Sequence, residues 1–305
     1  MTSVCIAGAG AIGSLLAAHL DRVAQVGVLV RREEHAVALR ERGLRVSGRA
    51  DFTAHPRVAT DPQALGPAEL VIVACKGPDL EPLGRRLEGA FGGATVMTIQ
   101  NGLGADEILG RHGDWPLLSA VTFMSGTRHD DAHVEYVLDT ATWIGPSRGT
   151  SGDDARAVAQ LLRDGGLQAE GLDDLRPALW SKLIFNATVN AVAALTDLPH
   201  DHHFAERARP ADLGHLVHDL IAEGRAVAAA AGVELRDDPW DMNVLATRRG
   251  SRHLPSMLED VLARRPTEVE LICGALVREG QRQGVPVPLH TALYRLVSAR
   301  EASYR

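Results

Sequence analysis

Lysine and asparagine are scarce in this 305-residue sequence. Of its 32 Lys and Arg residues, only Lys76 and Lys182 are lysines. The four asparagines are Asn101, Asn186, Asn190 and Asn243. Arginine cannot be deprotonated in a protein, whereas the pKa of a lysine can fall far enough for it to hand over a proton. The two positions that keep lysine are therefore candidate functional groups, although chance can also leave two lysines.

Cysteine is rare as well, and its distribution argues against a disulfide framework. Cys5, Cys75 and Cys273 are far apart and lie in apolar runs, which is typical of reduced thiols in a cytoplasmic protein. No apolar stretch reaches membrane-spanning length, and the first apolar run begins without a basic segment. We therefore expect a cytoplasmic protein with no membrane partner and no signal peptide.

The charges and the histidines exclude two further classes of function. The net charge is −7, and the basic residues form no stripe that nucleic acid would need. His200, His202 and His203 cluster, but no second pair of ligands stands at metal-site spacing. We expect a solvated loop there, with no metal site and no nucleic-acid partner.

A glycine-rich segment follows the first apolar run. Residues 3–7 suit a buried parallel strand, residues 8–13 read GAGAIG, and residues 14–20 are helical in pattern. Such a turn lets a pyrophosphate approach the backbone and the positive end of the helix. We therefore expect a dinucleotide to bind at Gly8, Ala9, Gly10, Ala11, Ile12 and Gly13.

The second predicted strand, residues 25–30, ends in Arg31-Arg32. An NAD-binding fold usually carries an acidic residue there for the ribose hydroxyls. A guanidinium instead binds a 2′-phosphate, so Arg31 favours NADP(H). Glu33 and Glu34 follow directly and count slightly against this interpretation.

Two more buried strands predict the edge of the sheet where a ligand binds. Residues 70–75 end at Lys76, and residues 95–99 end just before Gln100-Asn101-Gly102. Ligands of open α/β sheets lie outside the carboxyl ends of the strands, so Lys76 and Asn101 are predicted to meet the cofactor. The predicted class is an α/β dinucleotide-binding domain over residues 1–172, with further strands at 117–122 and 141–144.

The second half, residues 173–305, has helical periodicity and predicts an all-α domain. Its first helix, residues 175–195, carries Lys182, Asn186 and Asn190 on one stripe, because residues four apart share a helix face. Polar groups in so apolar a helix are costly unless something pairs with them. The stripe predicts a substrate site, or alternatively hydrogen bonds to the first domain.

These residues together resemble the ketopantoate reductases (2-dehydropantoate 2-reductases) over nearly the full length of the chain. The specific part is the block LWSKLIFNATVNAVAALT at 179–196, with PSMLED at 255–260 and TEVE at 267–270. The weaker matches are GAGAIG, Arg31, Cys75-Lys76, Gln100-Asn101-Gly102 and Gly274.

The resemblance implies a Rossmann-type N-terminal domain, an all-α C-terminal domain and a cleft between them. It implies NADPH-dependent reduction of a 2-keto acid to a 2-hydroxy acid, in pantothenate biosynthesis. Lys182 corresponds to the family's catalytic lysine, and Glu268 to the acidic residue near the nicotinamide ribose. Asn186, Asn190 and Ser256 correspond to substrate-binding residues, with Asn101 and Lys76 also at the site.

Several departures from the family pattern leave the substrate open. Gly77-Pro78 intervene before Asp79, residues 121–126 read VTFMSG, and Glu135-Tyr136 replace a frequent x-His pair. His200 stands where an asparagine is often found. The alternatives are another 2-keto acid or an imine as substrate, or an NADP(H)-sensing protein without turnover. The Ala-rich stretch 226–231 suggests a homodimer, or else intramolecular packing.

Overall fold

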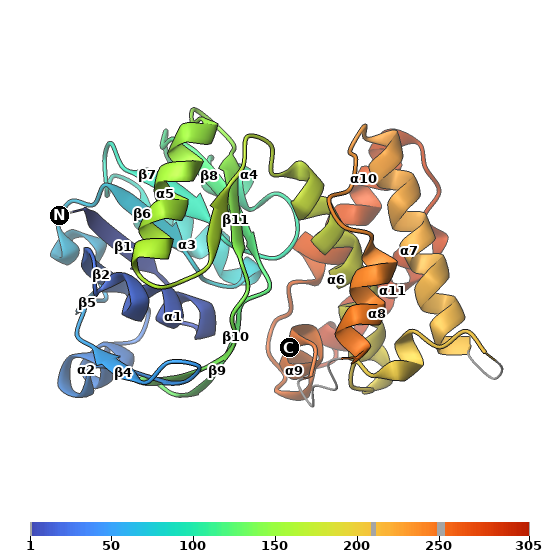
Figure 1. Cartoon of the computed structure of the whole chain (residues 1–305), viewed down its shortest axis with the longest axis horizontal. Helices are drawn as coiled ribbons and strands as arrows, with labels where there is room; N and C mark the ends of the chain where they lie inside the picture. The colour runs from blue at the N-terminus through green and yellow to red at the C-terminus, as the bar shows by residue number, and fades with distance from the viewer. Residues whose placement is uncertain (1, 209–211, 249–253, 305) are drawn as a thin grey trace. The chain divides into compact units, whose positions relative to one another are not determined.

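The computed structural model describes residues 2–208, 212–248 and 254–304, and the chain divides into two compact units (Figure 1). The α/β unit comprises Met1–Gln100 and Ala105–Leu175, and the helical unit comprises Asn101–Gly104 and Arg176–Arg305. The sequence placed the border at residue 172, close to this division. The predicted class, an α/β domain followed by a helical one, is confirmed.

An eight-stranded sheet forms the centre of the α/β unit, in the order β12-β11-β8-β7-β6-β1-β2-β5. Its strands are β1 (Ser3–Ala7), β2 (Gln25–Leu29), β5 (Arg57–Ala59), β6 (Leu70–Val73), β7 (Thr95–Thr98), β8 (Leu117–Thr122), β11 (Thr142–Pro146) and β12 (Ala169–Gly171). Neighbouring strands are parallel except β8 and β11. Every residue of β6 is buried, as expected for a parallel strand covered on both faces.

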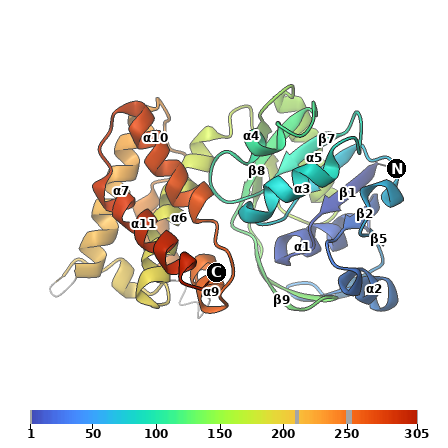
Figure 2. The same cartoon turned by 180° about the vertical axis from the view of Figure 1, so that it is seen from behind.

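Helices cover both faces of this sheet. They are α1 (Ala11–Leu20), α2 (Glu33–Arg42), α3 (Leu80–Leu87), α4 (Ala105–Leu109) and α5 (Gly152–Asp164), with short 3-10 turns at Pro62–Leu65 and Gly77–Asp79. α5 lies in front of the sheet in Figure 1, and α3 lies in front of it in the reverse view of Figure 2. α1 packs against α5, and α3 packs against α4.

A second, four-stranded sheet covers α1 and was not predicted from the sequence. Its order is β4 (Phe52–Ala54), β3 (Leu44–Gly48), β10 (His133–Leu138) and β9 (Ser125–Asp130). α1 touches all four of these strands as well as β1 and β2. Eight of its ten residues are therefore buried, and the helix is apolar all round rather than amphipathic.

The helical unit is built around α6 (Arg176–Thr196), which packs against most of its neighbours. The others are α7 (Asp212–Ala230), α8 (Pro239–Arg248), α9 (Ser256–Leu262), α10 (Ala275–Gln283) and α11 (Pro288–Ala302). Helical periodicity predicts one helix over residues 268–283, but Glu270–Gly274 form a π-helical turn and Glu268 precedes the helix. Periodicity also predicts a helix over residues 211–231, and its first residue lies outside the described residues.

By length and composition, α6 is the one helix among the described residues that would suffice to cross a membrane. The sequence analysis found no such stretch, and that prediction is wrong on this criterion. However, 78% of its most apolar 18-residue window is buried inside the protein. A helix surrounded by other helices in this way is typical of a protein core rather than of a membrane span.

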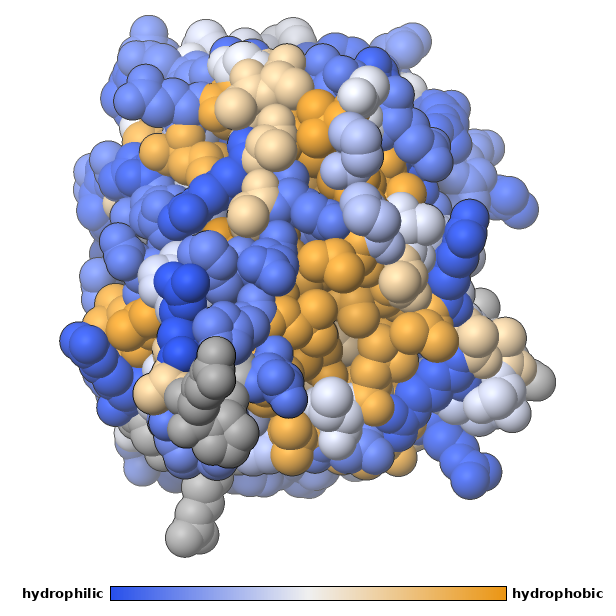
Figure 3. Space-filling view, turned by 90° about the vertical axis from the view of Figure 1, so that its right-hand side faces the viewer, coloured by the Kyte–Doolittle hydropathy of each residue, from blue (hydrophilic) through white to orange (hydrophobic). Residues whose placement is uncertain are grey.

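The outer surface of the helical unit carries exposed apolar side chains. Leu245, Leu262 and Leu296 are each more than half exposed. Figure 3 looks onto this unit, and apolar residues gather in the middle of the face that it shows, with hydrophilic residues around them. On α7, the side chains of Ala222, Ala226 and their neighbours at 229–230 are also exposed.

Candidate active site

The polar stripe of α6 is buried. Lys182 is 9% exposed, and Asn186 and Asn190 are each 6% exposed, in a helix whose other buried residues are largely apolar. The three residues follow one another at intervals of four, so they share one face of the helix. Burying these groups costs free energy that only polar partners can offset.

Burial changes the acidity of Lys182. Loss of hydration disfavours the ammonium and lowers the pKa of Lys182 from its usual 10.5 to about 8, while the negative charge of Glu268 partly opposes this shift. A lysine with a pKa near 8 is charged at neutral pH, yet it releases its proton far more easily than an exposed lysine. It therefore has the properties of a general acid.

Asn101, Glu268 and Asn186 form a hydrogen-bonded chain within the helical unit. The Asn101 amide donates to Glu268 Oε2 at 3.0 Å, and the Asn186 amide donates to Asn101 Oδ1 at 3.4 Å. The structure therefore brings together four predicted site residues, since Glu268 also acts on Lys182 through its charge. Asn101 was predicted from the sheet edge, but it groups with the helical unit.

The backbone next to Glu268 is anchored by a residue that the sequence analysis missed. Glu301, 6% exposed on α11, accepts hydrogen bonds from Thr267 N at 2.9 Å and Thr267 Oγ1 at 2.6 Å. Thr267 Oγ1 in turn accepts from Val269 N at 3.2 Å. No local pattern could have linked Glu301 to a residue 34 positions earlier.

The π-helical turn after Glu268 receives the segment that carries Asn101. Leu103 N donates to Leu271 O at 2.9 Å, and Gly102 lies against the same carbonyl with a φ of +99°. A Cβ at Gly102 would lie 1.9 Å from Leu271 O, so only glycine fits. Turns of the π type are frequent at functional sites, and this one holds Asn101 beside Glu268.

Two further predicted residues belong to the same unit. Asn190 lies one turn beyond Asn186 on α6, and Ser256 begins α9, which packs against α6. No contact that links either side chain to the Asn101–Glu268 chain is recorded among the described residues.

His200, which replaces the family's usual asparagine, is fixed in one orientation. Its Nε2 lies 2.8 Å from Asn243 Oδ1, and the Asn243 amide donates to Phe204 O at 3.0 Å. His200 therefore donates through Nε2. Its ring stands edge-on to Phe185 of α6 and to Phe204, and burial lowers the pKa of His200, which favours the neutral ring.

In the α/β unit, the glycine turn has the shape that a diphosphate needs. Gly8 has a φ of +108°, and a Cβ there would lie 2.9 Å from Cys75 N. A Cβ at Gly13 would lie 1.9 Å from Gly8 O, whereas one at Gly10 would meet nothing within 4 Å. Gly10 therefore borders open space at the start of α1, whose first turn has no acidic residue and no side-chain cap. The residues fit an anionic dinucleotide.

The charged residues predicted for this site stand at the ends of the strands that flank β1. Arg31 follows β2 and is paired with Asp79 at 3.0 Å, and Lys76 follows β6. Glu33, which counted against an NADP(H) site, accepts hydrogen bonds from Arg40 and Thr60.

Gln100 was matched to the family as part of Gln100-Asn101-Gly102, but no role was predicted for its side chain. Its amide nitrogen donates to Val73 O at 2.8 Å and to Cys75 O at 2.9 Å. The side chain thus fixes the backbone that leads from β6 to Lys76.

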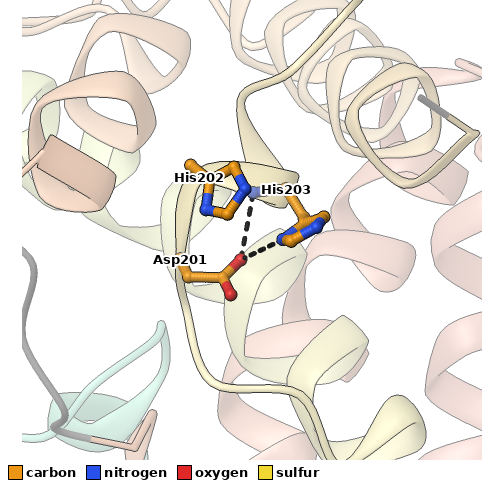
Figure 4. A group of neighbouring side chains, drawn as sticks. All are labelled: Asp201, His202 and His203. Carbon is orange, nitrogen blue, oxygen red and sulfur yellow. Dashed lines mark hydrogen bonds and ion pairs between the residues drawn. The ribbon is translucent and has the colours of Figure 1, made fainter. Parts of the chain in front are cut away.

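The histidine cluster is an exposed turn. Asp201 Oδ1 accepts from His203 N and lies 3.0 Å from His203 Nδ1, as Figure 4 shows. The ligand atoms of Asp201, His202 and His203 lie within 4.8 Å of one another, so they have the spacing of a metal site. Asp201 acts here as the N-cap of the 3-10 turn His202–Phe204.

Comparison with known proteins shows the family of the chain. The family model for ketopantoate reductase PanE/ApbA matches residues 4–149, and the model for the C-terminal region of that family matches residues 174–301. A 2-dehydropantoate 2-reductase of Archaeoglobus fulgidus is 31% identical over 299 residues, which cover 98% of each chain.

Two solved structures have the same fold. A PanE/ApbA family ketopantoate reductase from Ralstonia eutropha JMP134 superposes with a TM-score of 0.86, at 28% identity and 99% coverage of both chains. D-mandelate dehydrogenase, solved with NADH and anilino(oxo)acetate, superposes with a TM-score of 0.90 at 22% identity, again over 99% of both chains. The chain therefore belongs to the ketopantoate reductase PanE/ApbA family and is an oxidoreductase of that family.

Proposed function

We propose that this protein uses NADPH to reduce a 2-keto acid to a 2-hydroxy acid, and that the substrate is 2-dehydropantoate, which becomes pantoate. The observation that carries the proposal is Lys182, a buried lysine with a pKa of about 8 opposite a chain of Glu268, Asn101 and Asn186. The A. fulgidus relative bears the name of this activity.

The phosphates of the cofactor are assigned to residues of the α/β unit. The glycine turn with the start of α1 would hold the pyrophosphate, Arg31 would pair with the 2′-phosphate, and Lys76 would add positive charge at the end of β6. Asn101 and Glu268 are assigned to the nicotinamide ribose, because an amide and a carboxylate both suit its hydroxyls. When bound, the reduced nicotinamide supplies the hydride.

Lys182 handles the proton. Its ammonium donates a hydrogen bond to the carbonyl oxygen and draws electron density toward it. As the carbonyl carbon gains the hydride, the C=O π pair moves onto oxygen, and that oxygen takes a proton from Lys182 Nζ. The neutral amine then takes up a proton from solvent. Glu268 stabilises the ammonium before transfer, because its charge raises the pKa of Lys182.

Neutral donors orient the substrate. Asn186, Asn190 and Ser256 can hydrogen-bond the carboxylate and a hydroxyl of the keto acid. None of these three side chains carries a charge, so none of them forms an ion pair with Lys182 that would neutralise its ammonium. These three residues are thus assigned to substrate orientation, and proton donation is assigned to Lys182.

A second candidate keeps this chemistry and changes the keto acid. His200 and Phe185 present an imidazole edge and an aromatic ring beside α6, and D-mandelate dehydrogenase shares the fold. Together they favour a 2-keto acid with an aromatic group as the alternative substrate.

Steady-state assays with NADPH separate these possibilities. 2-Dehydropantoate and phenylglyoxylate are compared by the loss of NADPH absorbance, with kcat/KM for each. A higher kcat/KM for 2-dehydropantoate supports the proposal, and a higher value for phenylglyoxylate supports the alternative. Tight NADPH binding without turnover of any 2-keto acid would instead indicate a cofactor-sensing protein.

The homodimer and the cytoplasmic location remain predictions. Exposed alanines on α7 and exposed leucines elsewhere in the helical unit support an association surface. Light scattering at micromolar concentration tests it. A mass twice the 32.6 kDa of one chain is expected, and a single-chain mass would refute the dimer.

A further inference from the structure

The Arg31–Asp79 pair spans the strand that carries the glycine turn. Arg31 follows β2 and Asp79 follows β6, and these two strands flank β1 in the sheet. Adjacent strands are about 4.8 Å apart, so the pair bridges roughly 10 Å. Arg31 Nη1 donates to Asp79 Oδ1 at 3.0 Å. The bridge thus stands beside the turn that we assign to the pyrophosphate.

Both partners are accessible. The Arg31 side chain is 74% exposed and that of Asp79 is 49% exposed. Among the described residues, the recorded contact of the Arg31 guanidinium uses Nη1 alone, which leaves its other N–H groups facing solvent. An exposed pair of this kind adds little to stability, so folding gives no strong reason for it.

The neighbouring arginine is used differently. Arg32 is paired with Asp131, and Asp131 also lies 3.4 Å from Arg128 and 4.0 Å from His35. Arg32 therefore belongs to a cluster with several members, whereas Arg31 has one carboxylate as its partner. Only Arg31 is arranged so that one incoming anion can displace one carboxylate.

We propose that Asp79 is a specificity-determining residue that competes with the 2′-phosphate of NADP(H) for Arg31, and thereby narrows the preference for NADPH over NADH. This inference rests on the proposed NADP(H) site. NADH has a neutral 2′-hydroxyl, which Asp79 does not repel. This hydroxyl can donate a hydrogen bond to the Asp79 carboxylate. A 2′-phosphate instead carries up to two negative charges toward a guanidinium that is already paired.

Electrostatics gives the size of the expected effect. A carboxylate on one side of the guanidinium lies about 6–7 Å from a phosphate on the other, in a solvated setting. Repulsion at that distance, together with the loss of the Arg31 contact, corresponds to about 3- to 20-fold in affinity. Raising the salt concentration should reduce the effect, because the groups are exposed.

Asp79→Asn is the informative variant. It removes the charge and keeps the shape, and it should fold normally because Asp79 makes no side-chain cap contact at the start of α3. Asp131→Asn is the control, since it removes a half-buried carboxylate from the adjacent Arg32 instead of from Arg31. A thermal melt of each variant checks the fold.

Calorimetric titration of the adenosine half isolates the effect from the nicotinamide. Adenosine 2′,5′-bisphosphate and adenosine 5′-monophosphate differ only in the 2′-phosphate. For Asp79→Asn, we expect the bisphosphate to bind about 3- to 20-fold more tightly and the monophosphate to change by less than about twofold. Asp131→Asn should change both by less than about twofold. NADPH and NADH titrations should give the same pattern.

The outcomes separate this inference from the proposed function. If Arg31→Ala leaves the bisphosphate affinity unchanged, the NADP(H) site itself is wrong. If Arg31→Ala weakens bisphosphate binding but Asp79→Asn changes nothing, only the role of Asp79 is overturned. An equal gain for both nucleotides would also overturn it, because the effect would then not concern the 2′-phosphate. In the Arg31→Ala background, the gain from Asp79→Asn should largely disappear.

Discussion

The two units each contain an opposite-charge pair, and the pairs differ in burial. Arg31–Asp79 in the α/β unit is exposed, at 74% and 49% of the side chains. Lys182 and Glu268 in the helical unit are each 9% exposed. Solvent screens the first pair, so its partners can exchange for a ligand. In the second pair, burial removes the hydration of the Lys182 ammonium and lowers the pKa of Lys182.

The difference shows how one chain can separate selection from chemistry. An exposed guanidinium keeps its charge at any physiological pH, and it is suited to choosing between cofactors that differ by a phosphate. A buried ammonium with a lowered pKa is suited to giving up a proton. Variants of the buried pair should therefore change rates, whereas variants of the exposed pair should change affinities.

The largest effect is expected from Lys182→Ala. Loss of the proton donor should lower kcat by on the order of 10²–10⁴-fold, the usual worth of general acid catalysis. NADPH affinity should change by less than about threefold, because Lys182 lies outside the α/β unit, to which we assign the cofactor phosphates. Pre-steady-state turnover and NADPH titration measure the two quantities, and an unchanged kcat would remove Lys182 from the mechanism.

A smaller effect, on affinity, is expected from Arg31→Ala. The NADPH-over-NADH preference should shrink by about 5- to 150-fold, corresponding to roughly 1–3 kcal/mol for a charge-assisted hydrogen bond. The value of kcat at saturating cofactor should stay within about twofold. Equal binding of NADPH and NADH by the unmodified protein would contradict the assignment of Arg31 to a 2′-phosphate.

The smallest effect is expected from Glu301→Gln. Glu301 connects helix α11 to Thr267, the residue before Glu268. The neutral amide oxygen accepts the Thr267 N–H and O–H bonds more weakly than the carboxylate does, so Glu268 should shift and kcat should fall by about 3- to 10-fold. With Glu268 displaced, the apparent pKa of Lys182 should also fall, since Glu268 is what raises it.

Glu279→Gln is the control for that variant. Glu279 is a buried carboxylate of the same unit, 7% exposed, and it accepts from Gln283 rather than from the backbone near Glu268. It should leave the pH profile unchanged. If both variants lose rate with no movement of the profile, Glu301 acts only on stability.

Local sequence patterns were enough to predict much of the fold. The bounds of β1 and β8 were predicted correctly, and those of α6 to within one residue at each end. The two strands are apolar runs and the helix has a regular 3.6-residue period, and each has clear flanking signals. The four-stranded sheet was missed because β9, with sequence SGTRHD, has no alternation of apolar and polar residues. Its pairing with β10 is set by tertiary packing on α1.

The sequence also predicted part of the candidate site. Scarcity and spacing identified Lys182, Asn186 and Asn101, which the structure brings together. No role at the site was predicted for three residues, because each acts through a partner that is distant in sequence. They are Asp79, Gln100 and Glu301. The π-helical turn was also not predicted, since its contact with Gly102 joins segments that are far apart in the sequence.

The pH dependence of turnover in the unmodified protein and in Lys182→Arg tests the central claim most directly. Reduction requires the ammonium, so kcat of the unmodified protein should fall as pH rises through about 8, where Lys182 loses its proton. Oxidation of the hydroxy acid requires the amine, so its rate should rise over the same range.

Lys182→Arg keeps the positive charge but cannot release a proton. It should bind the keto acid within about tenfold of the unmodified protein, turn over roughly 10²-fold more slowly, and show no decline near pH 8. If Lys182→Arg instead turns over at the unmodified rate with the same decline near pH 8, the proton comes from another group and the role of Lys182 is wrong.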